Sequence, residues 1–335
     1  MLDRYRAAQD IPGISAVVIR HNEPVFVGGS GVADIETGRP VTADTVFYIG
    51  SVTKVLTATL VLHLAETQIL TLADTVPGIN DVDQQAEINV RQLLTHSSGL
   101  EREGDFNYWF TGEFPERESL AHYLSHTRLR SEPGTRLHYS NIGFAVLGGF
   151  IERKLDSSFG EVLTARILEP LGMSATGLPG PAADLAIGYT PIGRIIPSKS
   201  RSFAGVGRRI GNRNERNYHD AKSMGPAFGA YSTARDLANL ALFLLGNGND
   251  DVLSQEARTQ MRQRQPLGRG LGVGLSRRNG NEVISHGGWF AAHRSRVLID
   301  PVNGIAVIVL ANSDSAAVGQ IADALYDAAL DTRPR

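Results

Sequence analysis

Segments with strand-like patterning occupy the two ends of this 335-residue chain, and a long, mainly helical stretch separates them. Near the N-terminus, Ile14–His21 and Val25–Asp34 flank the turn His21–Pro24, which is typical of a hairpin. Further short strands are predicted late in the chain at Leu271–Ser276, Glu282–Ser285, Ala292–Ile299 and Ile305–Ala311. The pattern predicts one antiparallel sheet built from both chain ends, with a helical lobe inserted between them.

The middle of the chain shows apolar residues at helical spacing. Helices are predicted near residues 2–8 and over 51–67, 90–94, 117–127, 142–155, 158–168, 233–246 and 254–262, with a final amphipathic helix at Ala316–Leu330. We therefore expect an α/β fold of the α+β type. Residues 1–48 and 266–335 would form the sheet domain, and residues 49–265 a mainly helical domain. A cleft between two such domains is the expected place for a site.

Composition excludes several classes of protein. The chain is 42% hydrophobic and 20% charged, has a net charge of −2 and contains no cysteine. Because the net charge is close to zero, we expect no nucleic-acid partner. We expect no membrane span, because the longest apolar stretches are too short to cross a bilayer. The basic stretch 193–217 is interpreted as a solvated, mobile excursion; a rim that attracts anionic substrates and a nucleic-acid site are the alternatives. Without a signal peptide the chain reads as cytoplasmic, or as periplasmic or secreted if it is a trimmed form.

A serine and a lysine meet where a strand-like run leads into the predicted helix 51–67. Val46–Ile49 is followed by Gly50, then Ser51 opens the helix and Lys54 lies three residues later on the same face. A lysine that burial keeps neutral could take the proton of the serine, and the helix start directs N–H groups toward developing charge. The alternative is an ordinary capping serine beside a solvated lysine.

Two further clusters could face the same cleft. Tyr139-Ser-Asn141 precedes the predicted helix 142–155, where it either presents a phenol and an amide or caps and packs against the helix. His286-Gly-Gly-Trp289 follows a predicted strand, and its glycines would let a bound chain approach the strand edge. The alternative for this cluster is a bulge with a partly buried histidine.

His96 lies beside two serines in Leu94-Thr-His-Ser-Ser-Gly99. Neighbours on one turn seldom reach the geometry of a nucleophile and its base, so we interpret His96 as structural. The chain has no Gly-x-Ser-x-Gly elbow, no His-Glu-x-x-His motif and no phosphate-binding loop. We expect neither a metal nor another cofactor.

In this order and spacing, the three clusters resemble the serine β-lactamase and penicillin-binding-protein superfamily, in particular its branch of class C β-lactamases, D,D-peptidases, D-aminopeptidases and carboxylesterases. Ser51-Val-Thr-Lys54 is similar to the Ser-x-x-Lys motif of the family, and Tyr139-Ser-Asn141 is similar to Tyr-x-Asn. The third element, Lys/His-x-Gly, is matched by His286-Gly-Gly288.

The resemblance implies a serine hydrolase that works through an acyl-enzyme. It makes Ser51 the nucleophile and gives the proton transfers to Lys54 and Tyr139, with the resting base left open. Asn141 would bind the substrate beside Gly288. The backbone N–H groups of Ser51 and Trp289 would form the oxyanion hole, where loss of one donor typically costs about 2.7–4 kcal/mol.

The third motif departs from that of class C β-lactamases, because His286 replaces a lysine and Gly287 replaces a threonine. An imidazole titrates near neutrality, so we expect the cation at this place to be pH-dependent. We therefore predict that the substrate is a small-molecule ester or a D-amino-acid-type amide or peptide. The alternatives are a class C-type β-lactamase and a non-catalytic protein that binds β-lactams or peptidoglycan fragments. The oligomeric state stays open.

Overall fold

The computed structural model describes residues 1–79, 87–178, 184–192, 206–216 and 220–331. Its centre is a six-stranded antiparallel sheet in the order β2-β1-β11-β10-β9-β8. The strands are β1 (Gly13–Arg20), β2 (Glu23–Gly31), β8 (Leu275–Arg278), β9 (Asn281–Phe290), β10 (His293–Asp300) and β11 (Ile305–Ala311). The pairing of β1 with β11 joins the two ends of the chain, which confirms the predicted sheet.

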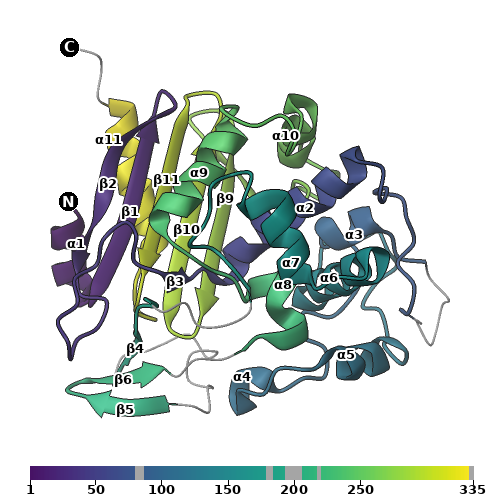
Figure 1. Cartoon of the computed structure of the whole chain (residues 1–335), viewed down its shortest axis with the longest axis horizontal. Coiled ribbons are helices and arrows are strands. Elements are labelled where there is room, and N and C mark those ends of the chain that lie inside the picture. The colour runs from purple at the N-terminus through teal and green to yellow at the C-terminus, as the bar shows by residue number, and fades with distance from the viewer. Residues whose placement is uncertain (80–86, 179–183, 193–205, 217–219, 332–335) are drawn as a thin grey trace.

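Helices cover both faces of this sheet (Figure 1). Strand β11 is apolar throughout, and its alternate residues enter two different cores. Val307 and Val309 pack with α11 (Val318–Asp331), while Ile308 and Leu310 belong to the larger core shared with α9 (Ala234–Leu245). Helix α1 (Leu2–Gln9) packs against β1 and β2.

A mainly helical part lies beside the β9 side of the sheet (Figure 1). Its central helix is α2 (Thr53–Glu66), in which every residue from Thr53 to Leu64 is buried. A helix that is buried on all sides stands in the middle of a lobe rather than on its surface. Around it lie α3 (Val90–Leu94), α4 (Tyr108–Thr111), α5 (Arg117–Leu124), α6 (Asn141–Leu155), α7 (Phe159–Leu163) with the π-turn Thr164–Leu168, α8 (Gly225–Phe228) and α10 (Gln255–Arg262).

The predicted strand Leu271–Ser276 is wrong over most of its length, because β8 begins only at Leu275. Gly272 has a left-handed φ of +70°, and a Cβ there would collide with Ala58 of α2. Gly272 therefore allows an irregular segment to approach the helix closely. Strand β9 is longer than predicted and contains the whole cluster from His286 to Trp289.

Strand β3 (Phe47–Tyr48) lies within the strand-like run Val46–Ile49 and pairs with β7 (Tyr231–Ser232). Strand β7 and the other short strands of the middle region were not expected; β4 (Gly188–Pro191), β6 (Arg213–Arg216) and β5 (Val206–Ile210) form a small sheet. Residues 206–216 of the basic stretch 193–217 thus form a hairpin, and its residues 193–205 and 217 lie outside the described residues. The domain bounds at residues 48 and 265 stay a prediction.

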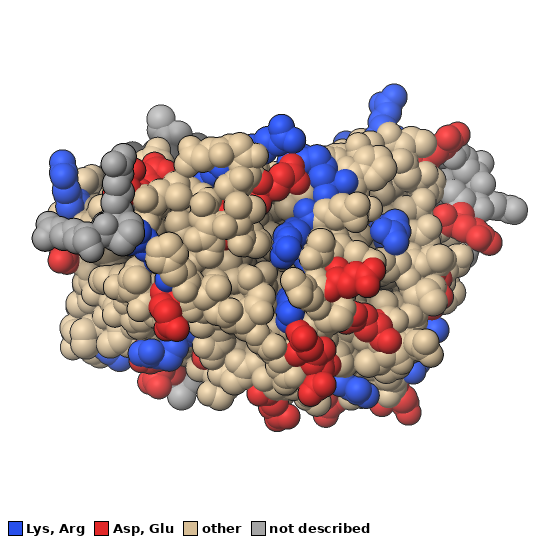
Figure 2. Space-filling model, turned by 90° about the horizontal axis from the view of Figure 1, so that it is seen from above, with Lys and Arg blue, Asp and Glu red and all other residues tan. Residues whose placement is uncertain are grey.

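Both signs of charge are interspersed on the face shown in Figure 2, with a band of Lys and Arg side chains near its middle. Among the helices of the described ranges, none has the length and apolar character needed to cross a membrane.

Candidate active site

Ser51 lies where β3 ends and the central helix begins. A 3-10 turn at Gly50–Val52 leads directly into α2, so the predicted helix start at Ser51 is confirmed to within one turn. Gly50 has a φ of +50°, and a Cβ at this position would collide with the backbone of Trp289. The glycine therefore allows the turn Gly50–Val52, which carries Ser51, to pack directly on strand β9.

Lys54 is fully buried beneath Ser51. Its Nζ donates hydrogen bonds to Asn141 Oδ1 at 2.7 Å, to the Ala227 carbonyl at 2.7 Å and to Ser51 Oγ at 3.4 Å. Burial lowers the pKa of Lys54, and the opposing effects of Tyr139 and Glu103 are smaller. The solvated lysine of the alternative interpretation is therefore wrong.

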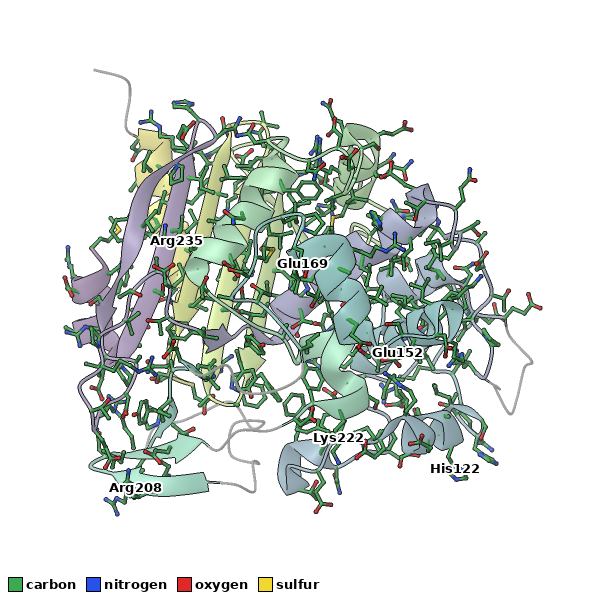
Figure 3. The ribbon with its side chains drawn as sticks, in the orientation of Figure 1. His122, Glu152, Glu169, Arg208, Lys222 and Arg235 are labelled. Carbon is green, nitrogen blue, oxygen red and sulfur yellow. The ribbon has the colours of Figure 1, made fainter. Side chains whose placement is uncertain are left out.

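Helix α8 holds the Ala227 carbonyl against Lys54. The preceding Pro226 carbonyl accepts a hydrogen bond from Thr57 of α2 at 2.7 Å. Ion pairs brace the surroundings, since Lys222 contacts Glu116 at 2.6 Å and Arg117 contacts Glu152 at 2.7 Å. Figure 3 shows Lys222 and Glu152 near α8.

Tyr139 lies between an imidazole and three basic side chains. Its ring stacks on His96 with centroids 4.3 Å apart and an interplanar angle of 28°. Lys54 Nζ lies 4.9 Å from the ring centroid, and the guanidinium carbons of Arg102 and Arg269 lie at 5.0 and 5.5 Å. Burial alone would raise the pKa of Tyr139, but the charge of Lys54 and hydrogen bonds with Ser51 and Lys54 outweigh it, so the pKa lies below its usual value.

His96 is fully buried, and burial holds its pKa well below its usual value. Its Nδ1 accepts a hydrogen bond from the backbone N–H of Ser140 at 3.1 Å. A neutral ring fixed in this way supports the phenol by stacking, in agreement with the structural role predicted for His96.

The cap of helix α6 places Asn141 in the site. Ser140 is the capping residue and accepts a hydrogen bond from the Gly143 N–H at 2.9 Å. Asn141 is buried, and its Nδ2 donates to Glu103 Oε2 at 2.8 Å while its Oδ1 accepts from Lys54. The amide is therefore held at both ends. Glu103 also accepts a hydrogen bond from Tyr108.

Glu103 is a residue of the candidate site that sequence reasoning missed. It follows two charged residues in a loop and belongs to no recognisable motif, so only its contacts identify it. A carboxylate that orients Asn141 and favours a protonated Lys54 is a positioning group for the whole cluster.

The third predicted cluster lies on β9, next to Ser51. A Cβ at Gly288 would collide with the Ile49 carbonyl and with Ser295 Oγ, so the strand and the serine turn are in backbone contact. Ser295 Oγ donates to the Ile49 carbonyl at 2.6 Å, which fixes the same contact from β10. This packing brings the backbones of Ser51 and Trp289 together.

His286 is buried, and its Nδ1 donates to the Gly287 carbonyl at 3.1 Å. Burial, followed by the charges of Lys54 and Arg269, lowers the pKa of His286 to about 3. The expectation of a titration near neutrality is therefore wrong, because the imidazole is uncharged throughout the neutral range. The burial of the ring and the neighbouring charges determine this pKa, and the residue type alone does not predict it.

Trp289 builds the apolar wall of the site. Its indole N–H donates to Asp314, and its ring lies 5.1 Å from that of Trp109. Trp109 in turn packs against Phe228 of α8, with ring centroids 5.3 Å apart. An aromatic surface therefore borders the cavity beside the turn Gly50–Val52 that carries Ser51.

A cavity of about 700 Å³ connects these groups. Six of the seven predicted site residues line it, and the seventh, Lys54, is buried beneath them; the six are Ser51, Tyr139, Asn141, His286, Gly288 and Trp289. In the described part of the chain, no group of three or more His, Asp or Glu side chains could hold a metal ion.

Both the sequence and the fold of this chain are similar to those of known proteins. The chain is 28% identical to penicillin-binding protein 4 of Amycolatopsis lactamdurans over 92% of its own length and 83% of that protein. It is 29% identical to esterase EstB of Burkholderia gladioli over 53% of its length and 50% of that protein, so it spans only about half of this relative.

Among solved structures, D-amino acid amidase from Ochrobactrum anthropi SV3, complexed with D-phenylalanine, superposes with a TM-score of 0.84. The match covers 99% of this chain and 97% of the amidase, at 23% identity, and so establishes a common fold. The family model described as Beta-lactamase matches residues 1–332. With the three motifs gathered around one cavity, the chain belongs to the beta-lactamase family.

Proposed function

We propose that this protein is a serine hydrolase that cleaves carboxylic esters or D-amino-acid-type amides through an acyl-enzyme on Ser51. The contact that carries the proposal is the 3.4 Å approach of a fully buried Lys54 amine to the Ser51 hydroxyl. Burial favours the neutral amine, and a neutral amine can accept the proton of an alcohol. The family and its relatives, which include an esterase and an amidase, support a hydrolase.

In the proposed reaction, Ser51 Oγ attacks the carbonyl carbon while its proton passes to Lys54 or Tyr139. The oxygen anion of the tetrahedral intermediate binds to the backbone N–H groups of Ser51 and Trp289. Collapse of the intermediate breaks the ester or amide bond, and the leaving group takes the proton. Water then attacks the acyl-enzyme by the same route and regenerates Ser51.

The lowered pKa of Tyr139 gives the proton a path between Ser51 and Lys54. Tyr139 interacts with both groups, so it can relay the proton in either direction. Asn141, held by Glu103 and Lys54, borders the cavity where it can orient the acyl part of the substrate.

Efficient β-lactam hydrolysis is a less favoured alternative, because the neutral His286 and the missing hydroxyl at Gly287 provide no permanent cation or hydroxyl donor at the third motif. A binding protein without turnover is less favoured still, since Ser51, Lys54 and Tyr139 are all present and in contact.

The test is single-turnover hydrolysis of 4-nitrophenyl butyrate, with intact-mass analysis of the quenched enzyme. We expect a burst of 4-nitrophenol and a butyryl adduct on Ser51, both absent from Ser51→Ala. Full turnover by Ser51→Ala would refute the proposal. Nitrocefin, assayed in parallel, reports β-lactam turnover.

A further inference from the structure

The Trp289 indole is held by a residue that lies behind the cavity wall. Its N–H donates a hydrogen bond to the carboxylate of Asp314, which belongs to the segment between β11 and α11. Asp314 is buried and does not line the cavity, whereas Trp289 does. This contact therefore joins the wall beside Ser51 to a part of the chain that contains none of the three motifs.

The same carboxylate is held from the other side by strand β4. Thr190 Oγ1 donates to Asp314 Oδ2 at 2.5 Å, while the indole of Trp289 donates to Oδ1. The backbone of Asp314 is paired as well. Its N–H donates to the Tyr189 carbonyl at 3.1 Å, and its carbonyl accepts from Arg294 Nε at 3.1 Å. Since both carboxylate oxygens and both backbone groups have partners, Asp314 is a fixed acceptor for the indole.

Two further groups pack on the indole. The guanidinium carbon of Arg294 lies 5.8 Å from the ring centroid of Trp289, and the two residues are opposite each other in the pairing of β9 with β10. The ring of Trp109 lies 5.1 Å from that of Trp289, at an interplanar angle of 33°. Together with the hydrogen bond to Asp314, these contacts restrict the rotation of the ring.

The backbone of Trp289 is packed against the turn that carries Ser51. A Cβ at Gly50 would lie 2.3 Å from the Trp289 nitrogen, so this N–H lies beside the nucleophile turn. Only two rotatable side-chain bonds separate the indole from the backbone. A ring anchored at its N–H therefore limits how far the Trp289 backbone can shift. A misplacement of about 1 Å in a reacting geometry can cost about 100-fold in rate.

Strand β4 supports the same end of β9 by a second route. A Cβ at Gly188 would lie 2.3 Å from the Ala291 carbonyl, in the turn between β9 and β10. Next to this turn, His293 Nε2 donates to the Ala186 carbonyl at 3.0 Å. Strand β4 and the residues just before it are therefore attached to the β9–β10 hairpin directly, and Asp314 extends this attachment to the indole.

We propose that Asp314 is a positioning residue of the hydrolase: by fixing the Trp289 indole, it holds the Trp289 backbone N–H toward the developing oxygen anion. Thr190 supports Asp314 from β4. The inference rests on the proposed hydrolase function and adds a residue that neither a motif nor the cavity lining identifies. Because the oxygen anion exists only in the transition state and intermediate, loss of this alignment should slow acylation without weakening substrate binding.

The first test is burst kinetics of Asp314→Ala with 4-nitrophenyl butyrate. We expect the limiting acylation rate to fall about 10- to 100-fold, which is less than the loss of a whole oxyanion donor can cost. The ester concentration that gives half of this rate should stay unchanged. Phenylboronic acid, which forms a tetrahedral anion on a serine, should bind more weakly by a similar factor.

Further variants assign the effect to the indole. Trp289→Phe keeps the backbone N–H but has no indole donor, so adding Asp314→Ala to it should change the acylation rate by less than about 2-fold. Thr190→Val removes the second donor to the carboxylate and should give a smaller loss of the same kind. Asp314→Asn keeps an acceptor for the indole and should recover most of the rate.

Asp236→Ala is the matched control. Asp236 is also a buried aspartate, and it accepts hydrogen bonds from Thr176 Oγ1 and the Ala175 N–H, but it does not line the cavity. Its removal leaves a buried donor without an acceptor, as Asp314→Ala does. We expect a comparable fall in thermal stability and no change in the limiting acylation rate, which separates a loss of stability from a loss of positioning.

Tryptophan fluorescence tests the contact without turnover. The chain contains two tryptophans, so Trp289→Phe leaves Trp109 as its one indole. Asp314→Ala should shift the emission spectrum of the otherwise wild-type protein and leave that of Trp289→Phe unchanged. Identical spectra of the wild type and Asp314→Ala would show that Asp314 does not hold the indole.

The outcomes separate the two proposals. A wild-type acylation rate in folded Asp314→Ala would overturn the positioning role, as would an equal loss in the Trp289→Phe background or in Asp236→Ala. A change confined to the half-saturating ester concentration would also overturn it. Where Asp314→Ala does not fold, wild-type kinetics of Thr190→Val would have the same meaning. Turnover by Ser51→Ala would refute the hydrolase proposal itself, and the emission spectra would still report the contact.

Discussion

The two ends of the cavity differ in how their cations are used. At the buried end, the amine of Lys54 has three acceptors within reach, and Asn141 and Glu103 continue the hydrogen-bonded chain to Tyr108. Beside β9, the Nε atoms of Arg269 and of Arg296 on β10 are buried and have no hydrogen-bond acceptor among the residues that the structure describes. The difference teaches that the fold gives the polar groups around Lys54 partners within the chain, whereas it leaves hydrogen-bond donors of the two arginines unused beside the cavity.

The largest effect is expected from a substitution at the buried end of the cavity. In Lys54→Arg, acylation should fall by at least about 10³-fold, because a guanidinium stays protonated and cannot accept the Ser51 proton. Burst amplitude with 4-nitrophenyl butyrate measures this, with circular dichroism to establish that the variant is folded. A burst that persists at the wild-type rate would exclude Lys54 as the base.

The contact between the two ends is tested at Gly288. In Gly288→Ala, the new Cβ collides with the Ile49 carbonyl, so we expect about 1–3 kcal/mol of destabilisation and a fall in kcat as Trp289 moves away from Ser51. Thermal unfolding and steady-state kinetics report the two effects. Gly28→Ala on β2 is the control, because a Cβ there meets nothing closer than 3.4 Å. Unchanged stability of Gly288→Ala would contradict the described packing.

Glu103→Gln sharpens the comparison by removing one charge from the buried chain. The Glu103 carboxylate raises the pKa of Lys54, so its loss should lower that pKa and shift the acid limb of the kcat/KM profile to lower pH. We also expect a loss of about 10-fold in kcat as Asn141 loses its charged acceptor. A pH–rate profile identical to that of the wild type would show that Glu103 has no influence on Lys54.

The smallest effect concerns His286. Because its pKa is about 3, the ring stays neutral between pH 5 and 9. The kcat/KM profiles of the wild type and His286→Gln should therefore be parallel over this range, and Glu103→Gln supplies a variant in which the profile moves. An inflection near pH 6.5 that is present in the wild type and lost in His286→Gln would show that the imidazole titrates.

Unlike the activity between pH 5 and 9, the stability of the protein in acid should depend on the protonation of His286. The folded-state pKa lies below the ordinary value of 6.5, so the unfolded chain binds more protons once the pH falls below 6.5. This contribution to stability is present above pH 6.5 and is lost progressively as the pH falls toward 3. Acid unfolding of His286→Gln, compared with the wild type, measures it.

The parts of the candidate site that the sequence predicts best are those in which a short-range pattern and a family motif agree. Ser51 lies in the 3-10 turn that leads directly into α2 and Lys54 lies in the first turn of α2, so their spacing alone brings them together. Tyr139 and His286 were placed by resemblance, because no local pattern shows that a loop and a strand far apart in the chain meet at one serine. The central sheet was predictable because its strands have clear alternating or continuous apolar patterns.

Other features depend on contacts that sequence spacing does not contain. The pKa of His286 follows from burial and from Lys54 and Arg269, which come from other elements. Glu103 acts through hydrogen bonds to Asn141 and Tyr108, and its loop carries no motif. Before β8, glycines occupy every second position from Gly268 to Gly274, which is a strand-like spacing. Gly272 instead allows an irregular segment to pack closely on Ala58.

The pairing of β1 with β11 has a consequence for the order of folding. Strand β9, which carries Trp289, is held through β10 and β11 to β1, which is synthesised long before it. Contacts over such long separations close slowly, because a large loop must lose entropy before they form. Helix α2 can therefore take shape early in synthesis, whereas the cavity beside β9 cannot form until the chain has left the ribosome at least as far as β11.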